Sequence, residues 1–160
     1  MTGPVFVDTN VFVYRHDASD AAKQARAQQW IALLARSRTG RLSFQVLQEL
    51  YATLTRVGRL HFDPADARQV VDALATWQPI PIELGILRRA WLVEERYRLA
   101  WWDALIVAAA QAAECPVLLT EDLQNGQVFD GLRVLDPFSA ADSSPQRILE
   151  TFGRGLHGGA

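Results

Sequence analysis

The stretch Val5-Phe6-Val7-Asp8-Thr9-Asn10 decides the fold, because a short apolar run stops abruptly at an acidic residue. An apolar run with a polar break after it predicts a short buried strand with Asp8 at its carboxyl end. The stretch Val117-Leu118-Leu119-Thr120 has the same character, and Asp122 lies two residues after it. Two such strands, far apart in the chain, indicate a sheet built from distant segments.

Helical patterns lie between the apolar runs. We expect helices over residues 20–38, 45–57, 63–77, 83–98 and 102–114, and further short strands over 42–44, 79–82 and 132–135. The strand at 79–82 contains two prolines and is therefore placed at an edge of the sheet. Alternating strands and helices predict an α/β fold, with a parallel sheet and helices on both of its faces.

The composition indicates one ordinary domain. The chain has 160 residues, of which 49% are hydrophobic, enough for a single core. No apolar stretch approaches the roughly 18 residues of a membrane span, and the first residues lack the features of a secretory signal. The one cysteine, Cys115, has no partner for an internal disulfide. We therefore expect a cytoplasmic protein that is not associated with a membrane.

The charge of the chain gives no sign of an overall basic surface. The formal net charge is −2, although the cations comprise fifteen arginines and one lysine, Lys23. Arginine suits phosphate binding, but an excess of arginine also follows from genome composition. Charge alone therefore decides nothing about a nucleic-acid partner.

Four acidic residues interrupt or border strongly apolar runs: Asp8, Glu49, Asp103 and Asp122. Ligands of parallel sheets sit beyond the carboxyl ends of the strands, where Asp8 and Asp122 are expected. Asp103 falls in the first turn of its predicted helix, and Glu49 lies in the first half of another. Because neighbouring carboxylates repel one another, a shared divalent cation is the simplest way to keep them together.

Each acid also has a plainer explanation when it is considered alone. Glu49 belongs to a polar stripe with Gln45, Thr53 and Arg56, which suits a solvated helix face. Asp8 and Asp103 suit helix caps, and Asp122 suits a turn. All four explanations would have to hold together, which favours the shared site.

The order of the motifs resembles the PIN-domain family, and within it the bacterial VapC-like toxins. The resemblance rests on residues 7–10, 45–51, 102–106 and 119–123, and on Val134-Leu135-Asp136-Pro137-Phe138 near the end. Together these motifs span about residues 4 to 138. The resemblance implies a nuclease domain over 1–138, with a three-layer α/β/α fold and a five-stranded parallel sheet, and a partly flexible tail over 139–160.

The resemblance also implies an activity and partners. PIN-domain toxins are typically Mg²⁺- or Mn²⁺-dependent endoribonucleases that a cognate antitoxin holds inactive, and they are commonly homodimers. Asp8, Glu49, Asp103 and Asp122 match the acidic quartet of the family, and Asn10 and Thr120 match its supporting polar positions. Two features depart from the pattern: Glu121 adds an acid beside Asp122, and the tail is longer.

We therefore expect Asp8, Asp103 and Asp122 to bind one or two Mg²⁺ or Mn²⁺ ions, because these hard cations prefer oxygen ligands. Glu49 is expected to orient or deprotonate the attacking water, or to bind a second ion. The arginines nominated for RNA contact are Arg15, Arg56, Arg96 and Arg98, and an ordinary role as surface charges is as good an explanation for each.

Three other functions are compatible with part of this pattern. A receiver-type signalling domain needs a lysine after a late strand, and Lys23 is far from one. A phosphatase of the DxD kind needs a second Asp at the position of Asn10. A PIN-like module that binds RNA or protein without catalysis remains an alternative. The loss of one of the four acids would support it, but all four are present.

Overall fold

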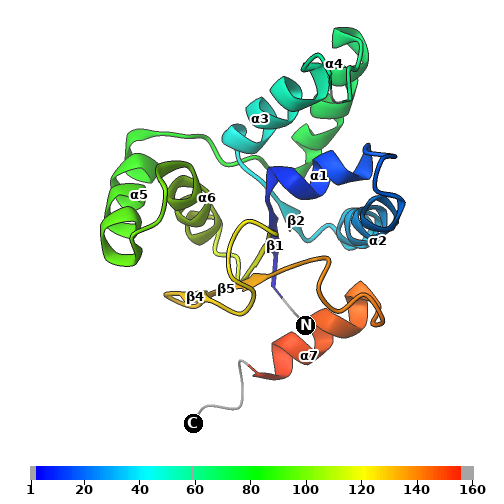
Figure 1. Ribbon diagram of the computed structural model, residues 1–160. Helices are drawn as coiled ribbons and strands as arrows, with labels where there is room; N and C mark the ends of the chain where they lie inside the picture. Colours follow the sequence, from blue (N-terminus) through cyan, green and yellow to red (C-terminus); the bar gives the residue numbers. More distant parts are fainter. Residues whose placement is uncertain (1–2, 59, 156–160) are drawn as a thin grey trace.

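The computed structural model describes residues 3–58 and 60–155. Its centre is a sheet of five short strands: β1 (Val5–Val7), β2 (Gly40–Arg41), β3 (Val117–Leu119), β4 (Val128–Phe129) and β5 (Leu132–Leu135). The strand order is β2-β1-β3-β5-β4 (Figure 1). β1 therefore lies between β2 and β3 although β3 follows it by more than a hundred residues.

Four of the strands are parallel. β1 pairs in parallel with β2 and with β3, and β3 pairs in parallel with β5, so that Val7, Leu119 and Leu135 lie side by side. The expectation of a wholly parallel sheet was wrong for the fifth strand, because β4 pairs with β5 in the antiparallel direction. The turn between them is Asp130-Gly131, and both residues have positive φ, as a tight hairpin turn requires.

Helices cover both faces of this sheet, and the α/β/α class is confirmed. α1 (Thr9–Arg15) and α2 (Ala21–Ser37) lie on one side, and α5 (Leu84–Tyr97) and α6 (Trp101–Ala112) lie on the other (Figure 1). α3 (Phe44–Thr55), α4 (Pro64–Ala73) and the 3₁₀ helix η1 (Leu74–Trp77) extend from one end of the molecule.

Two predicted strands were wrong. The segment at 42–44 is not a strand: the pairing residues of β2 lie just before it, and Phe44 already begins α3. The segment at 79–82 makes a single parallel bridge, between Ser43 and Ile80, and no strand. Ile80 makes both of the bridge's hydrogen bonds, and the ladder ends there because Phe44 already begins α3 and Gln78 has a positive φ of 56°.

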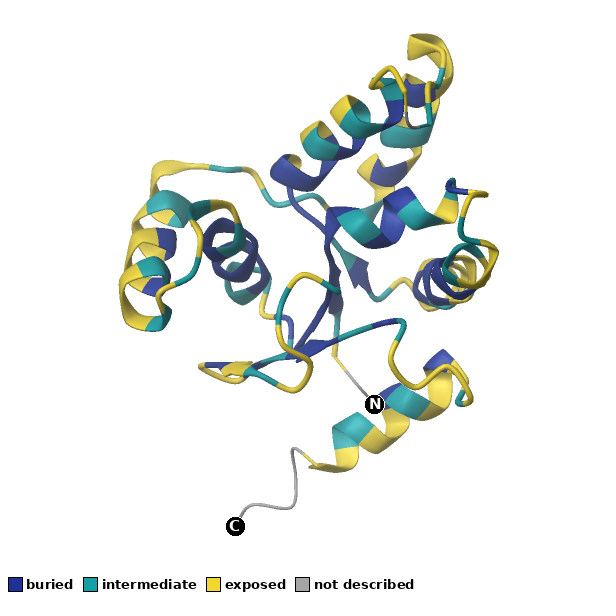
Figure 2. Cartoon of the chain, viewed as in Figure 1, coloured by how far each residue is buried: buried dark blue, intermediate teal, exposed yellow. Residues whose placement is uncertain are grey.

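The core is formed by the strands together with the apolar faces of the helices. Every residue of β1 and β3 is buried, and so is the run from Ala104 to Ala110 in α6 (Figure 2). Cys115 is buried as well, and burial raises the pKa of its thiol to about 12. Within the described residues, no helix is long and apolar enough to cross a membrane.

The segment after Phe138 includes a further helix, α7 (Pro145–Gly155), so that much of the tail expected to be partly flexible is helical. Its Leu149 is buried in the main core, and the guanidinium of Arg133 lies over the Phe152 ring, 5.0 Å from its centroid. The division of the chain at residue 138 into a nuclease domain and a tail stays a prediction. Residues 156–160 of the expected flexible tail lie outside the described residues.

Gly40 in β2 is a position where the sheet requires a glycine. A Cβ atom at Gly40 would overlap three carbons of the Trp77 ring, which is itself held edge-on against Phe12. We expect Gly40→Ala to lower the free energy of unfolding by about 1–3 kcal/mol through overpacking. Gly85→Ala is the matched control, because a Cβ there has nothing within 4 Å. Urea unfolding measures both; equal stability of the two variants would contradict the packing of Trp77 on β2.

Candidate active site

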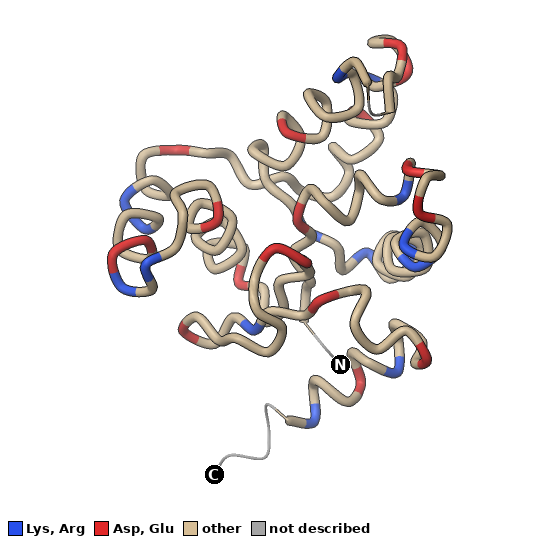
Figure 3. The backbone as a smooth tube through the Cα atoms, in the orientation of Figure 1, with Lys and Arg blue, Asp and Glu red and all other residues tan. Residues whose placement is uncertain are grey.

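Four separate elements carry the four acids to one end of the sheet. Asp8 follows β1 directly and caps α1, since its Oδ1 accepts a 2.7 Å hydrogen bond from the Thr9 amide. Asp122 lies in the loop after β3, Asp103 lies in the first turn of α6, and Glu49 lies in the middle of α3. Figure 3 shows acidic residues at the β1–α1 junction and in the loop after β3, both near the centre of the molecule.

Asn10 and Thr120 join Asp8 to Asp122. The Asn10 amide nitrogen donates to Asp122 Oδ2 at 3.0 Å, to Thr120 Oγ1 at 3.1 Å and, more weakly, to Asp8 Oδ2 at 3.4 Å. Thr120 Oγ1 donates to Asp8 Oδ2 at 2.8 Å and accepts from the Asp122 amide at 3.1 Å. The structure therefore brings the two expected supporting residues between two of the expected acids.

Glu49 is held at both of its carboxylate oxygens. Thr9 Oγ1 donates to Oε2 at 2.7 Å, and Gln45 Nε2 donates to Oε1 at 2.9 Å. The same Gln45 nitrogen also donates to the carbonyl of Trp102, the residue before Asp103, at 3.2 Å. Gln45 thus ties α3 to the start of α6, and the helix stripe of Glu49 is not simply a solvated face.

The sequence alone does not identify Thr9 and Gln45 as site residues. Gln45 belongs to the polar stripe of its helix, and Thr9 is the neighbour of Asp8 in the first motif. Their partners lie 40 and 57 positions away in the chain. No local pattern can signal such contacts, and only the folded chain shows that Gln45 is buried, with 5% of its surface exposed.

The electrostatics of the site show that the carboxylates interact. The pKa of Asp8 is raised to about 7, mainly by burial, and the charges of Asp122 and Glu49 contribute to the rise, whereas the hydrogen bonds from Thr120 and Thr9 oppose it. Burial also raises the pKa of Asp103, with the same two charges adding to the effect. Repulsion within the quartet is therefore built into the site and favours a bound cation.

The donor set fits a hard divalent cation. The quartet offers carboxylate oxygens only, and the buried Oδ1 of Asn10 has no hydrogen-bond partner. Across residues 3–58 and 60–155, however, no three His, Cys, Asp or Glu side chains are placed so that they could hold a metal ion as they stand. Two carboxylates are instead engaged by the Asn10 amide. Ion binding would thus require these side chains to exchange hydrogen bonds for metal contacts.

None of the four nominated arginines contacts an acid of the quartet through a hydrogen bond or ion pair. Arg15 and Arg56 are exposed at the ends of α1 and α3, and Arg98 is exposed at the end of α5. Arg96 donates to both carboxylate oxygens of Asp130 in the β4–β5 turn, at 3.1 and 3.2 Å. Their role in RNA binding stays a prediction.

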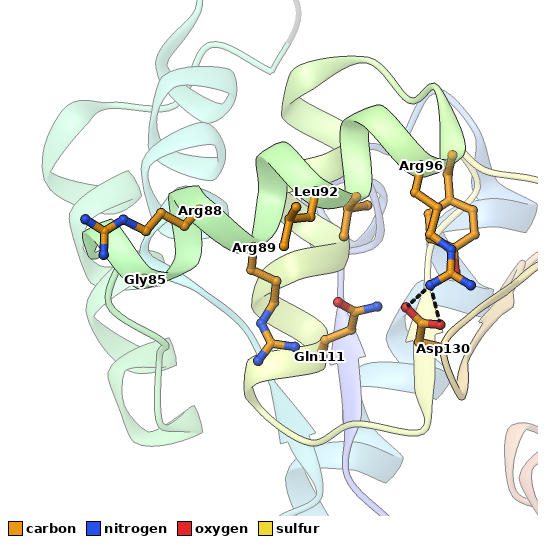
Figure 4. Close-up of a pocket in the computed structure, with 9 residues that line it drawn as sticks. Gly85, Arg88, Arg89, Leu92, Arg96, Gln111 and Asp130 are labelled. Atoms are coloured by element: carbon orange, nitrogen blue, oxygen red, sulfur yellow. Dashed lines mark hydrogen bonds and ion pairs between the residues drawn. The ribbon is translucent and has the colours of Figure 1, made fainter.

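Arg96 also lines a pocket of about 400 Å³ along α5. Figure 4 shows Arg96 directed toward Asp130 and Arg89 extending toward Gln111, while Arg88 points away from both. All three arginines are exposed. Their charge is a feature of the α5 surface, separate from the hydrogen-bonded network of the quartet.

Comparison with known proteins defines the class. The family model of the PIN domain matches residues 5–128, which include the whole quartet. The chain belongs to the PIN-domain family. No curated protein sequence matches the chain.

Solved structures with the same fold come from toxin–antitoxin complexes. A chain of a complex from Klebsiella pneumoniae is 23% identical, with a TM-score of 0.63, and the match covers 84% of this chain and 98% of that one. A chain of VapBC2 from Rickettsia felis, bound to a promoter DNA fragment, is 18% identical (TM-score 0.58; 82% and 98%). A chain of DNA-bound VapBC from Salmonella typhimurium is 15% identical (TM-score 0.60; 85% and 99%).

Proposed function

We propose that the protein is a metal-dependent endoribonuclease and the toxin of a VapC-like toxin–antitoxin pair. The observation that carries the proposal is the convergence of four acids at one end of the sheet: Asn10 and Thr9 link Asp8, Asp122 and Glu49 by hydrogen bonds, and Asp103 interacts with the charges of Asp122 and Glu49. Membership of the PIN-domain family supports a nuclease. The fold shared with chains of toxin–antitoxin complexes supports the toxin role.

Each acid has a place in this proposal. Asp8, Asp103 and Asp122 would hold one or two Mg²⁺ or Mn²⁺ ions, whose chemistry is to offset charge on the scissile phosphate and activate water. Asn10 and Thr120 fix the carboxylates of Asp8 and Asp122 relative to each other.

Glu49 is the residue best suited to orient the attacking water and accept its proton. Each of its oxygens already accepts one hydrogen bond, which fixes the plane of the carboxylate. A carboxylate oxygen has two acceptor positions, so each oxygen keeps one for water. Thr9 and Gln45 therefore act by aiming Glu49 rather than by contacting the RNA.

The experiment that tests the function is cleavage of total bacterial RNA by the purified protein, with Mg²⁺ or Mn²⁺ and with EDTA. We expect discrete fragments that form only with the metal ion. Their ends should be 5′-phosphate and 3′-hydroxyl, because water attacks the phosphorus atom and the 3′ oxygen leaves. A 2′,3′-cyclic phosphate would contradict this mechanism, and cleavage in EDTA would contradict the metal dependence.

The partners follow from the same proposal. A cognate antitoxin would bind the protein and block cleavage, and RNA would be the substrate. We also propose a homodimer and a cytoplasmic location. Expression of the wild-type chain in bacteria should arrest growth, and co-expression of the antitoxin encoded beside it should restore growth. Arrest that persists with the antitoxin would argue against the toxin–antitoxin pair.

Thr9→Val tests the aiming of Glu49. The change removes the hydroxyl that donates to Glu49 at 2.7 Å and keeps the shape of the side chain. We expect the cleavage rate to fall about tenfold, the usual effect of losing such a supporting hydrogen bond in a metal site. Thr9→Ser keeps the hydroxyl and should retain most of the rate. A steady-state cleavage assay compares them, and equal rates for the two variants would exclude the role of the hydroxyl.

A further inference from the structure

The loop that carries Asp122 is attached to α1 at two successive residues. Asn10 and Tyr14 lie one turn apart on α1, on the same side of the helix. Asn10 donates to Asp122 at 3.0 Å. Tyr14 reaches the neighbouring Glu121 through Lys23 of α2, whose Nζ lies 3.3 Å from the Tyr14 hydroxyl and 2.8 Å from Glu121 Oε2.

The second attachment is partly enclosed. The side chains of Lys23 and Glu121 are 34% and 22% exposed. The Lys23 ammonium lies 4.7 Å from the centre of the Tyr14 ring and 5.1 Å from that of Phe138. These two rings pack edge to face, 5.1 Å apart. Two aromatic rings and one carboxylate therefore hold the ammonium in a single place, which an ordinary surface ion pair does not achieve.

The pair also changes the charge beside the quartet. Glu121 places a fifth carboxylate next to Asp122, and the ammonium of Lys23 offsets it at 2.8 Å. The Glu121 hydrogen bond raises the pKa of Lys23, so the lysine keeps its charge at neutral pH. Without this cation, Glu121 would add to the repulsion that the quartet already contains.

Asp122 needs such support. Asp122 is exposed, and its side chain accepts one hydrogen bond, from Asn10. The loop that carries it has no helix or strand between β3 and β4. The backbone of residues 120–122 is otherwise held by the amide of Asp122, which donates to Thr120 Oγ1. A fixed Glu121 restricts the same stretch of backbone, at the residue directly before Asp122.

We propose that Lys23 is a positioning residue of the active site, and that its ion pair with Glu121 holds the Asp122 loop in the conformation that binds the divalent cation. This inference rests on the proposed function. It gives a role to the only lysine of the chain and to the acid that departs from the family pattern at position 121. Lys23 acts through Glu121 and the loop and does not contact the RNA.

The test combines ion binding with catalysis. Mn²⁺ affinity is measured by titration calorimetry, and kcat and KM are measured with an RNA substrate, for Lys23→Met, Glu121→Gln and the double variant. We expect each single change to weaken Mn²⁺ binding and lower kcat about tenfold, with KM nearly unchanged, as for other residues that support metal ligands. The double variant should be no worse than either single variant, because both remove one interaction.

A charge exchange and a matched control complete the experiment. Lys23→Glu combined with Glu121→Lys should recover most of the affinity that Lys23→Glu alone loses. Arg36→Met removes an exposed cation from the last turn of the same helix, α2, away from the quartet, and should leave Mn²⁺ affinity and kcat unchanged. Thermal unfolding of every variant identifies any that fails to fold, and Glu121→Gln is the mildest change.

The outcomes separate the two proposals. If the wild-type protein binds Mn²⁺ and cleaves RNA but the Lys23 and Glu121 variants match it, the positioning role fails and the function stands. Effects that add in the double variant, or that follow only the melting temperature, also overturn the positioning role. If the wild-type protein neither binds Mn²⁺ nor cleaves RNA, the proposed function fails and the positioning role fails with it.

Discussion

Asp103→Asn is expected to abolish RNA cleavage almost completely while the protein stays folded. Asp103 is partly buried in the first turn of α6 and interacts with the charges of Asp122 and Glu49. Asparagine has the same shape but cannot supply a charged ligand to a cation. If the ion contributes several kcal/mol of charge stabilisation in the transition state, its loss lowers the rate on the order of 10³-fold.

Asp130→Asn is the matched control for this prediction. Asp130 is an exposed acid in the β4–β5 turn, and its partner Arg96 lies outside the quartet. The same chemical change there should alter the cleavage rate less than twofold, which is within the usual effect of a surface substitution. Rates are compared in single-turnover assays at saturating Mn²⁺, with circular dichroism to confirm folding. An active Asp103→Asn protein would remove Asp103 from the site.

The ion-free protein is expected to lose stability as the pH rises toward neutrality, and Asp8 is the main cause. The pKa of Asp8 is about 7 in the folded chain and 3.8 is its ordinary value. At a pH between these two pKa values, Asp8 keeps its proton in the folded protein but has released it in the unfolded chain. The contribution of Asp8 to the free energy of unfolding is therefore greatest below about pH 4. It decreases between about pH 4 and pH 7 and is constant at higher pH.

The size of the effect follows from the shift. At about 1.4 kcal/mol per pKa unit, ionisation of Asp8 removes up to about 4 kcal/mol of stability by pH 8. The raised pKa of Asp103 also makes stability decrease as the pH rises. Burial lowers the pKa of His16, which has the opposite effect on stability. Subtracting the stability of Asp8→Asn from that of the wild-type protein isolates the part that belongs to Asp8.

Urea unfolding in EDTA at pH 5, 6, 7 and 8 measures this difference. We expect Asp8→Asn to become progressively more stable than the wild-type protein as the pH rises, and to show no cleavage. Saturating Mn²⁺ should stabilise the wild-type protein at pH 8 and should do much less for Asp8→Asn. A difference that is constant from pH 5 to 8 would contradict the burial of a carboxylate with a raised pKa at this position.

The convergence of Asp8, Asp103 and Asp122 could be predicted because each of these acids stands next to a local signal. Asp8 and Asp122 follow apolar strands, and the carboxyl ends of parallel strands meet at one edge. Asp103 opens a helix that is apolar on all sides, which predicted its burial beside the sheet. These arguments depend only on short runs of neighbouring residues, which is the information that a single sequence contains.

The elements missed from the sequence lack such signals. α1 has seven residues, five of which are β-branched or aromatic, so its sequence resembles a continuation of the strand. β4 has two residues, and only the Asp130-Gly131 turn marks its hairpin. The contacts of Lys23 with Glu121, and of Thr9 with Glu49, join segments that only the folded chain brings together.

The most direct test of the account is to locate the cation. A crystal of the protein soaked in MnCl₂ is measured near the manganese absorption edge, and the anomalous difference map shows where manganese binds. The account predicts a peak in contact with carboxylate oxygens of Asp8, Asp103 and Asp122, with the Asn10 amide turned away from at least one of them. A map without a peak at the quartet, from protein that cleaves RNA with Mn²⁺, would contradict it.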